Sequence, residues 1–232
     1  MGDTDAHDMH GIELVGHRGC PDHGPENTVR ALVAAADRLP AVEFDLRRCG
    51  SGELVVFHDE RVDDITDGAG RVADLDLATL RDCRVEGSDE PVATFSEVLA
   101  EVPESVTLQV ELKESGLWAD ARALLADHDH PVRLSSFSAP ALAEIARSDW
   151  EPATGLLFGE YHEANLDLAA VLGCASVQPH ADLCLDTDIV DRAHAAGFRV
   201  LAWGLADAET IPALADRGVD AVTTDTWDVP GV

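Results

Sequence analysis

The fold is decided by a stretch that begins with Leu14-Val15-Gly16-His17-Arg18-Gly19, continues through Val42-Glu43-Phe44-Asp45 and ends with Val55-Val56-Phe57-His58-Asp59. It contains three short apolar runs, and each run leads into ionisable side chains. The runs are too short and too rich in β-branched residues to favour helix, so we predict buried strands. If these strands lie side by side, their ionisable ends converge on one small volume.

The residue types in these clusters suit the hydrolysis of a phosphate ester. Glu43 and Asp45 share one face of a strand because they are two residues apart, and carboxylates bind hard divalent cations. Arg18 can donate paired hydrogen bonds to phosphate, and His17 and His58 can transfer protons near neutral pH. In an acidic chain, a solvated acidic face is the alternative for the carboxylates alone. Three clusters at three strand ends favour a catalytic site.

The chain has 232 residues and a formal net charge of −29. This length fits a single domain with one core. The charge argues against nucleic acid or an anionic membrane as a partner, because both would repel the protein. Acidic residues are spread along the chain and Lys113 is the only lysine, so we interpret the charge as salt adaptation and predict a halophilic source. Lys113 is either a chance survivor of this composition or a compact cation placed beside phosphate.

Five cysteines are scattered along the chain without a C-x-x-C pair. They predict reduced thiols in a cytoplasmic protein rather than disulfides or a zinc site. Residues 1–11 are polar and acidic and predict a flexible tail, in which His7, Asp8 and His10 could bind a stray metal ion. No apolar run reaches the length of a membrane span, so we expect no stable membrane anchor.

From residue 106 onward, strand and helix patterns alternate regularly. Together with strands at 12–15 and 41–46, the later strands make eight core strands, which predicts an α/β protein with a (β/α)8 TIM barrel. The predicted later strands are 106–112, 132–135, 153–158, 175–178, 198–203 and 221–224, and the predicted helices are 118–125, 140–147, 163–172, 187–196 and 208–217. A doubly wound open sheet is the alternative, disfavoured because no glycine-rich dinucleotide motif follows the first strand.

The first half of the chain is less regular. We predict a helix at about 29–38 capped by Asn27 or Thr28, with Glu26 either a first-turn acid or a site residue. Residues 53–57 predict an antiparallel partner of the second strand across Gly50-Ser51-Gly52. Residues 59–93 predict a small insertion after the second barrel strand, with one short helix near 77–83, and a helix at 94–101 capped by Thr94 follows. Residues 12–232 would form one domain.

Catalytic residues of such barrels lie at the carboxyl ends of the strands. This rule selects His17, Arg18, Glu43, Asp45, His58, Glu111, Lys113, Ser136, Gln178, Trp203 and Asp225.

Four motifs together resemble the signature of the glycerophosphodiester phosphodiesterases: His17-Arg18-Gly19, Pro25-Glu26-Asn27-Thr28, Glu43-Phe44-Asp45 and His58-Asp59. The resemblance continues in order over nearly the whole chain after residue 11, and ends in the motif at residues 218–225. It implies hydrolysis of a small-molecule glycerophosphodiester to glycerol phosphate and an alcohol, and an insertion that covers the active site.

The resemblance also implies roles for individual residues. Glu43, Asp45 and Glu111 match metal ligands, which suits Mg2+ or Ca2+ and also Mn2+. His17 and His58 match the general acid and base. Residues that match phosphate and substrate contacts are Arg18, Lys113 and Trp203.

One departure from the family pattern follows the tryptophan, where members commonly have Thr-Val-Asn and this chain has Gly204-Leu205-Ala206. The alcohol group of the substrate is therefore left open. Two alternatives remain: a lysophospholipase D-like enzyme that acts on lipid diesters, which needs an apolar approach to the site, and a non-catalytic phosphate- or metal-binding barrel, which should lack one member of the set.

Overall fold

The computed structural model describes residues 11–150, 152–204 and 210–229. Eight parallel strands form a closed barrel, because β1 pairs with β10 along one edge and with β2 along the other. The strands are β1 Glu13–Gly16, β2 Ala41–Arg48, β5 Thr107–Leu112, β6 Val132–Ser136, β7 Ala153–Phe158, β8 Ser176–Pro179, β9 Arg199–Ala202 and β10 Ala221–Thr224. The predicted TIM barrel is confirmed.

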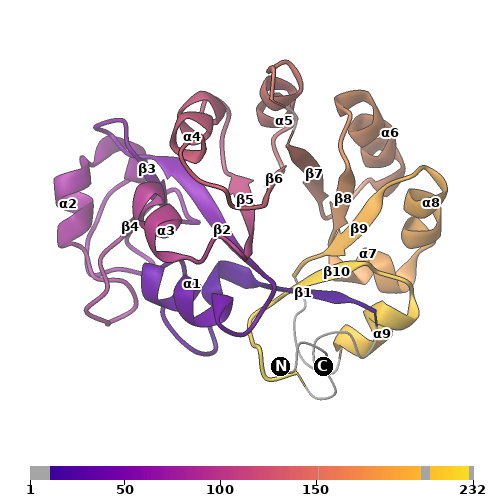
Figure 1. Ribbon diagram of the computed structural model, residues 1–232, viewed down its shortest axis with the longest axis horizontal. Helices are drawn as coiled ribbons and strands as arrows, with labels where there is room; N and C mark the ends of the chain where they lie inside the picture. The colour runs from indigo at the N-terminus through magenta and orange to yellow at the C-terminus, as the bar shows by residue number, and fades with distance from the viewer. Residues whose placement is uncertain (1–10, 151, 205–209, 230–232) are drawn as a thin grey trace.

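Helices follow the strands and lie outside them, as Figure 1 shows for α4, α5, α6 and α8. They are α1 Val29–Ala36, α3 Phe95–Glu101, α4 Trp118–Leu125, α5 Ala139–Ala146, α6 His162–Leu172, α8 Ile189–Ala195 and α9 Thr210–Asp216. The sequence missed α7 Ala181–Asp186, which follows β8 directly. Of the helix predicted at 208–217, residues 208 and 209 lie outside the described residues.

Side-chain caps explain where two helices begin. Thr28, not Asn27, caps α1 by accepting a hydrogen bond from the Ala31 N–H at 3.2 Å. Thr94 and Glu97 form a reciprocal capping box at the start of α3, which confirms Thr94 as the cap. Each such cap stabilises a helix by about 1 kcal/mol.

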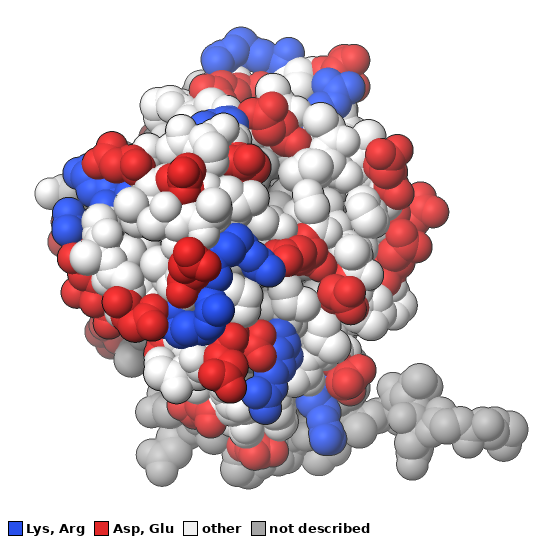
Figure 2. Space-filling model, turned by 90° about the vertical axis from the view of Figure 1, so that its left-hand side faces the viewer, with Lys and Arg blue, Asp and Glu red and all other residues white. Residues whose placement is uncertain are grey.

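The second strand reaches beyond the barrel and organises the insertion. Its first residues pair with β1, while its last three pair with β3 Leu54–Val56 in antiparallel register, which confirms the predicted turn. The chain continues through a short 3-10 helix η2 Val72–Asp74 and α2 Leu77–Asp82 to β4 Ala93–Thr94, which pairs with β3. Buried side chains such as Phe57, Val62 and Leu80 give this part its own small core. Figure 2 shows the face around the insertion, where basic and acidic side chains are intermixed.

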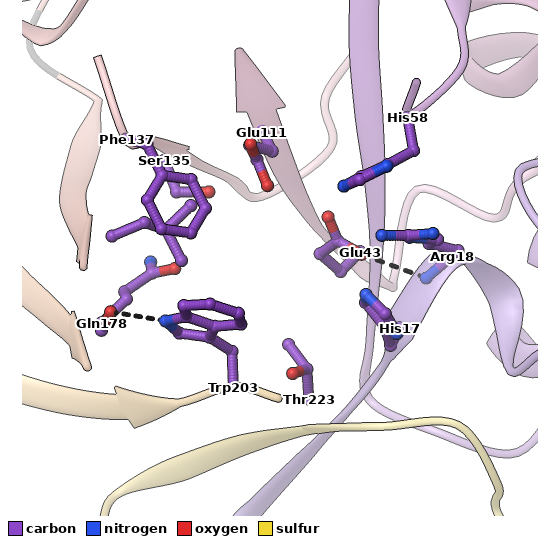
Figure 3. A pocket seen from close by; sticks show the side chains of 11 residues that line it. His17, Arg18, Glu43, His58, Glu111, Ser135, Phe137, Gln178, Trp203 and Thr223 are labelled. Carbon is purple, nitrogen blue, oxygen red and sulfur yellow. Dashed lines mark hydrogen bonds between the residues drawn. The ribbon is translucent and has the colours of Figure 1, made fainter. Parts of the chain in front are cut away.

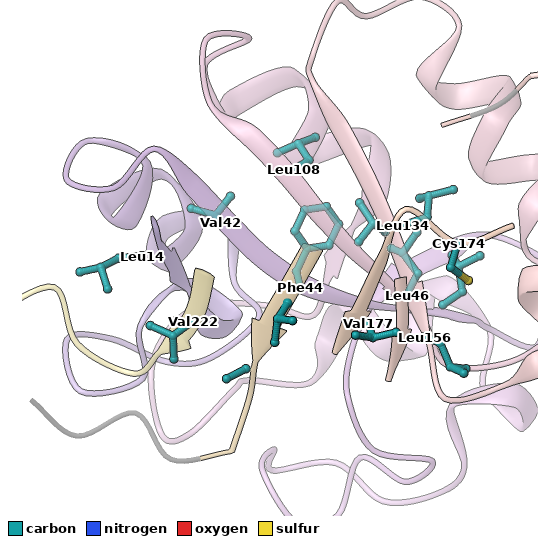
Figure 4. Close-up of a cluster of buried hydrophobic side chains, with 14 of the residues drawn as sticks. Leu14, Val42, Phe44, Leu46, Leu108, Leu134, Leu156, Cys174, Val177 and Val222 are labelled. Carbon is teal, nitrogen blue, oxygen red and sulfur yellow. The ribbon is translucent and has the colours of Figure 1, made fainter. Parts of the chain in front are cut away.

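The main core lies between the strands and the helices. Alternate residues of each strand point outward, so Val42, Phe44 and Leu46 of β2 pack under the helices (Figure 4) while Glu43 and Asp45 face the barrel interior. Burial of each large apolar side chain contributes about 1.5–3 kcal/mol.

An apolar layer of the barrel interior is formed by Val15, Ala41, Leu201 and Ala221. At its amino-terminal end, Glu13 of β1 forms ion pairs with Arg133 of β6 at 2.9 Å and with Arg199 of β9 at 2.6 Å. These pairs join strands on different sides of the barrel. The polar side chains of the pocket lie at the opposite end.

All five cysteines are buried and free, as the scattered spacing predicted. Within the described part of the chain, no helix is long and apolar enough to cross a membrane. The predicted tail at residues 1–11, apart from Gly11, lies outside the described residues, and a single domain over 12–232 stays a prediction.

Candidate active site

A pocket lies at the carboxyl ends of the barrel strands. Its lining residues come from the strand ends and the turns that follow them. In Figure 3, His17, Arg18, Glu43 and His58 lie on one side of this pocket, and Phe137, Gln178 and Trp203 lie on the other. The full lining is His17, Arg18, Glu43, His58, Glu111, Ser135, Phe137, Leu157, Gln178, Trp203 and Thr223.

Three buried carboxylates form one cluster at this end. Glu43 and Asp45 are two residues apart on β2, and Glu111 of β5 lies directly beside Asp45 in the parallel register. One oxygen atom from each of the three lies within 4.8 Å of the others. The exposed fractions are 6% for Glu43, 1% for Asp45 and 8% for Glu111, so little water screens their mutual repulsion.

The electrostatics of the cluster fit a bound cation. Burial raises the pKa of Glu43 well above its usual value, and the neighbouring Asp45 charge adds to the rise. The Glu43 carboxylate accepts a hydrogen bond from the Arg18 backbone N–H at 3.0 Å, but among the described residues it forms no ion pair with a cationic side chain. An all-oxygen donor set with one carboxylate unneutralised suits a hard divalent ion.

Asp45 is held by two cations and an amide. Lys113 Nζ lies 3.5 Å from Asp45 and 2.7 Å from Glu111, and Arg18 Nε lies 3.4 Å from Asp45. The Asn27 amide donates to the same carboxylate at 2.9 Å. Burial alone would raise the pKa of Asp45, but the charges of Lys113 and Arg18 outweigh burial and lower it. Asp45 and Lys113 do not line the pocket itself, so the cluster reaches it through Glu43 and Glu111.

Arg18 is positioned by the turn that follows β1. This turn is a short 3-10 segment, η1 His17–Gly19, in which Arg18 has a positive φ of 49°. Its guanidinium forms hydrogen bonds to both oxygens of Glu26 at 2.9 and 3.0 Å. Glu26, for which the sequence left two roles open, therefore orients Arg18 at the pocket wall.

The pKa values of the two histidines are shifted in opposite directions. His17 Nδ1 lies 2.6 Å from the Asp225 carboxylate. Burial alone would lower the pKa of His17, but this hydrogen bond and the Glu43 charge outweigh burial and raise it. Burial lowers the pKa of His58, and Arg18 and Lys113 add to the decrease, against Asp45, which raises it. His58 Nδ1 is held by Asp59 at 2.8 Å.

Aromatic side chains line the opposite wall. The Trp203 indole N–H donates to the Gln178 backbone carbonyl at 3.0 Å, and the ring packs edge-on against Phe137 at 5.1 Å between ring centroids. Phe137 is 48% exposed although it is large and apolar. This wall offers an apolar surface next to the ionic one.

The structure also shows residues that the sequence analysis missed. Ser135 and Phe137 line the pocket, whereas Ser136, selected from the sequence, points away and donates to the Leu112 carbonyl at 2.6 Å. The reason is strand alternation: Ser135 of β6 faces the barrel interior, so the next residue, Ser136, faces the helices. Asn27, considered only as a cap, instead holds Asp45 with its side chain and has a positive φ of 56°.

The sequence matches the model of the glycerophosphoryl diester phosphodiesterase family over residues 17–229. It is 25% identical over 227 residues to a glycerophosphodiester phosphodiesterase of Caldanaerobacter subterraneus, with 91% of this chain and 93% of the relative covered. Among solved structures, an Oleispira antarctica phosphodiesterase in complex with the product sn-glycerol-3-phosphate is 30% identical, with a TM-score of 0.86 and 92% of both chains covered.

A glycerophosphodiester phosphodiesterase from Thermotoga maritima shares the fold, with a TM-score of 0.81 at 22% identity and coverage of 94% of this chain and 96% of that one. The family match begins at His17, directly after β1, and covers the motifs at the strand ends and the other seven barrel strands. The chain therefore belongs to the glycerophosphoryl diester phosphodiesterase family of phosphoric diester hydrolases.

Proposed function

We propose that the protein hydrolyses glycerophosphodiesters to glycerol phosphate and an alcohol in a reaction that requires a divalent cation, Mg2+, Ca2+ or Mn2+. One observation carries the proposal: His17, Arg18, Glu43, His58 and Glu111 line the same pocket. The match to a phosphodiesterase solved with sn-glycerol-3-phosphate supports the substrate class.

Glu43, Asp45 and Glu111 would hold the cation. When bound, it would polarise the phosphoryl oxygens and offset the charge that develops on them. Arg18 lies beside this cluster and would donate hydrogen bonds to the phosphate, and Glu26 would keep its guanidinium in place. Lys113 would act mainly by balancing Asp45 and Glu111, because it pairs with both carboxylates and is not among the residues that line the pocket.

We assign His58 as the base and His17 as the acid. The pKa of His58 is lowered, so its imidazole stays neutral to a lower pH than an ordinary histidine and can accept a proton. That proton comes from the attacking hydroxyl, which belongs either to water or to the glycerol of the substrate. His17 has a raised pKa and is held by Asp225, so it stays protonated longer and can donate to the leaving alkoxide.

A lipid diester is the second candidate substrate. Phe137 is 48% exposed and lies against Trp203 in the pocket wall. An apolar rim of this kind could accept an acyl chain. A non-catalytic barrel is disfavoured, because every member of the expected set is present. The free, buried cysteines support our proposal of a cytoplasmic location.

A substrate panel tests the proposed function. The purified protein would be incubated in high salt with a divalent cation and either water-soluble glycerophosphodiesters or micellar lysophospholipids. Release of glycerol phosphate from soluble diesters is the expected result, whereas release of lysophosphatidic acid alone would favour the lipid alternative. If neither product forms under any cation, the proposed function is wrong.

A further inference from the structure

A second group of metal-binding side chains lies at the other end of the barrel. Glu104 precedes β5, and His128 and His130 precede β6, so all three lie at the amino-terminal ends of these strands. The two loops come together because β5 and β6 are parallel neighbours, and the Leu108 N–H donates to the Pro131 carbonyl at 2.8 Å. The candidate active site lies at the carboxyl ends, so the two groups are separate.

His130 is prepared to bind a ligand through one ring nitrogen. The side chain is 8% exposed, and its Nε2 lies 3.0 Å from the Val102 carbonyl oxygen. A carbonyl only accepts, so Nε2 carries the proton and Nδ1 carries a lone pair. Nδ1 is buried and has no hydrogen-bond partner within the described part of the chain. A histidine that binds a metal ion through one ring nitrogen usually donates the N–H of its other ring nitrogen to a carbonyl or carboxylate.

The other two candidate ligands lie close to His130, and the ring centroids of His128 and His130 are 5.7 Å apart. His128 Nδ1 is 4.0 Å from Glu104 Oε1, and the Asp129 backbone N–H donates to the same oxygen at 3.2 Å. One donor atom from each of Glu104, His128 and His130 lies within 4.8 Å of the others. Ligands of a Zn2+ ion bond at about 2.0–2.1 Å, so the three need to approach one another slightly. Glu104 is half exposed and His128 is partly exposed, so both can move.

We propose that Glu104, His128 and His130 bind a divalent transition-metal ion, with Zn2+ as the first candidate and water as a fourth ligand. Two imidazoles and one carboxylate favour zinc-like ions over Mg2+ and Ca2+, which prefer oxygen, so this site and the carboxylate cluster select different ions. The net charge of −29 raises the local concentration of any cation. The bound ion joins the loops before β5 and β6 and stabilises the fold, because it binds the native state alone.

Zn2+ binding tests this site. We would use untagged protein with His7 and His10 replaced by alanine, in excess Mg2+ to occupy the carboxylate cluster, and titrate Zn2+ by calorimetry. One equivalent is expected, with a rise in melting temperature. His128→Ala, at a partly exposed position, should weaken binding at least about 10-fold and abolish the rise. His130→Asn should do the same, and His162→Ala, a matched histidine outside the cluster, should change neither quantity.

Co2+ gives an independent readout, because imidazole ligands to tetrahedral Co2+ produce visible absorption bands that a carboxylate-only site does not. Those bands should vanish in His128→Ala while hydrolysis of the diester in Mg2+ stays at the wild-type rate. If His130→Asn fails to fold, His128→Ala alone decides. Unchanged Zn2+ affinity in His128→Ala would overturn the proposal. So would loss of the bound Zn2+ in Glu43→Gln but not in His128→Ala, because the ion would then belong to the carboxylate cluster.

Discussion

His17 and His58 face the same pocket but differ in what surrounds them. His17 lies beside two acids, Asp225 and Glu43, and its pKa is raised. Burial lowers the pKa of His58, and the charges of Arg18 and Lys113 add to the decrease against the opposing charge of Asp45. The two imidazoles therefore hold protons in different pH ranges, which is what a base and an acid that act together require.

Replacement of either histidine should reduce turnover without unfolding the protein, because both are partly exposed. His17→Ala and His58→Ala should each lower kcat by on the order of 10²-fold or more on natural diesters. A nitrophenyl diester has a leaving group that needs no proton. It should therefore restore the turnover of His17→Ala, which lacks the acid, while turnover by His58→Ala, which lacks the base, stays slow. The double variant should lose less than the product of the two single losses, since the pair acts as a unit.

The pH profile supplies the matching control. In the wild type, kcat/KM should fall at low pH as His58 gains its proton and at high pH as His17 loses its own. The fall at high pH should be absent in His17→Ala. Restoration of His58→Ala rather than His17→Ala by the activated diester would reverse the assignment, and near-normal kcat in both variants would exclude it.

At the scale of elements, the barrel strands separate stability from function. β2 shows this most clearly: Val42, Phe44 and Leu46 pack under the helices, while Glu43 and Asp45 reach the site. At the opposite end, Glu13 of β1 joins Arg133 and Arg199. The ion pairs of Glu13 hold strands in place, so they contribute to stability and not to chemistry.

Glu13→Gln should lower the free energy of unfolding by about 1–2 kcal/mol at neutral pH, because two arginines lose their shared partner. Burial alone would raise the pKa of Glu13, but hydrogen bonds from Arg133 and Arg199 outweigh burial and lower it. The stabilisation is therefore present above the unfolded-state pKa of about 4.3 and is lost as pH falls through the lower folded value. Denaturant unfolding at neutral and acid pH measures this.

The difference in the free energy of unfolding between wild type and Glu13→Gln should therefore decrease as the pH is lowered. Glu163→Gln, which breaks an exposed ion pair with Arg192, serves as the control and should change little. Equal unfolding midpoints for wild type and Glu13→Gln at neutral pH would contradict the role given to Glu13.

Sequence reasoning predicted the elements best where hydrophobic patterns were long and regular. The eight strands and the turn between β2 and β3 follow from such patterns, and the family motifs select the residues that meet in the pocket. It missed α7, a six-residue helix directly after β8, because so short a segment has no clear period. It chose Ser136 over Ser135 because an error of one residue in a strand reverses which face a side chain occupies. The hydrogen bond from the Asn27 amide to Asp45 joins separate elements of the chain, so no local sequence pattern predicts it.

At the scale of the whole molecule, charge dominates. The net charge is −29, and the basic residues that are present are largely engaged with acids, as in Arg71–Glu60 and Arg81–Glu97. The remaining acidic side chains repel one another, and this repulsion grows as the Debye length increases at low salt.

The melting temperature should therefore fall by on the order of 10 °C between molar and low concentrations of potassium chloride, since a few kcal/mol of repulsion shift it by this much in a domain of this size. Chloride is preferred because sulfate would also strengthen hydrophobic burial. Sucrose at matched osmolality strengthens hydrophobic burial without screening charge, so it serves as the control and should raise the melting temperature by less than the salt does. A melting temperature that is independent of salt would exclude the salt-adapted interpretation of the charge.

The central claim is that a cation held by Glu43, Asp45 and Glu111 is required for diester hydrolysis. The most direct test is the rate of glycerol phosphate release by chelator-treated protein as Mg2+, Mn2+ or Ca2+ is added back, in wild type, Glu43→Gln and His128→Ala. Wild type and His128→Ala should be inactive without metal and regain activity at the same cation concentration. Glu43→Gln should need at least about 10-fold more cation while it melts near the wild type. Full turnover by the metal-free protein, or an identical cation dependence in Glu43→Gln, would contradict the claim.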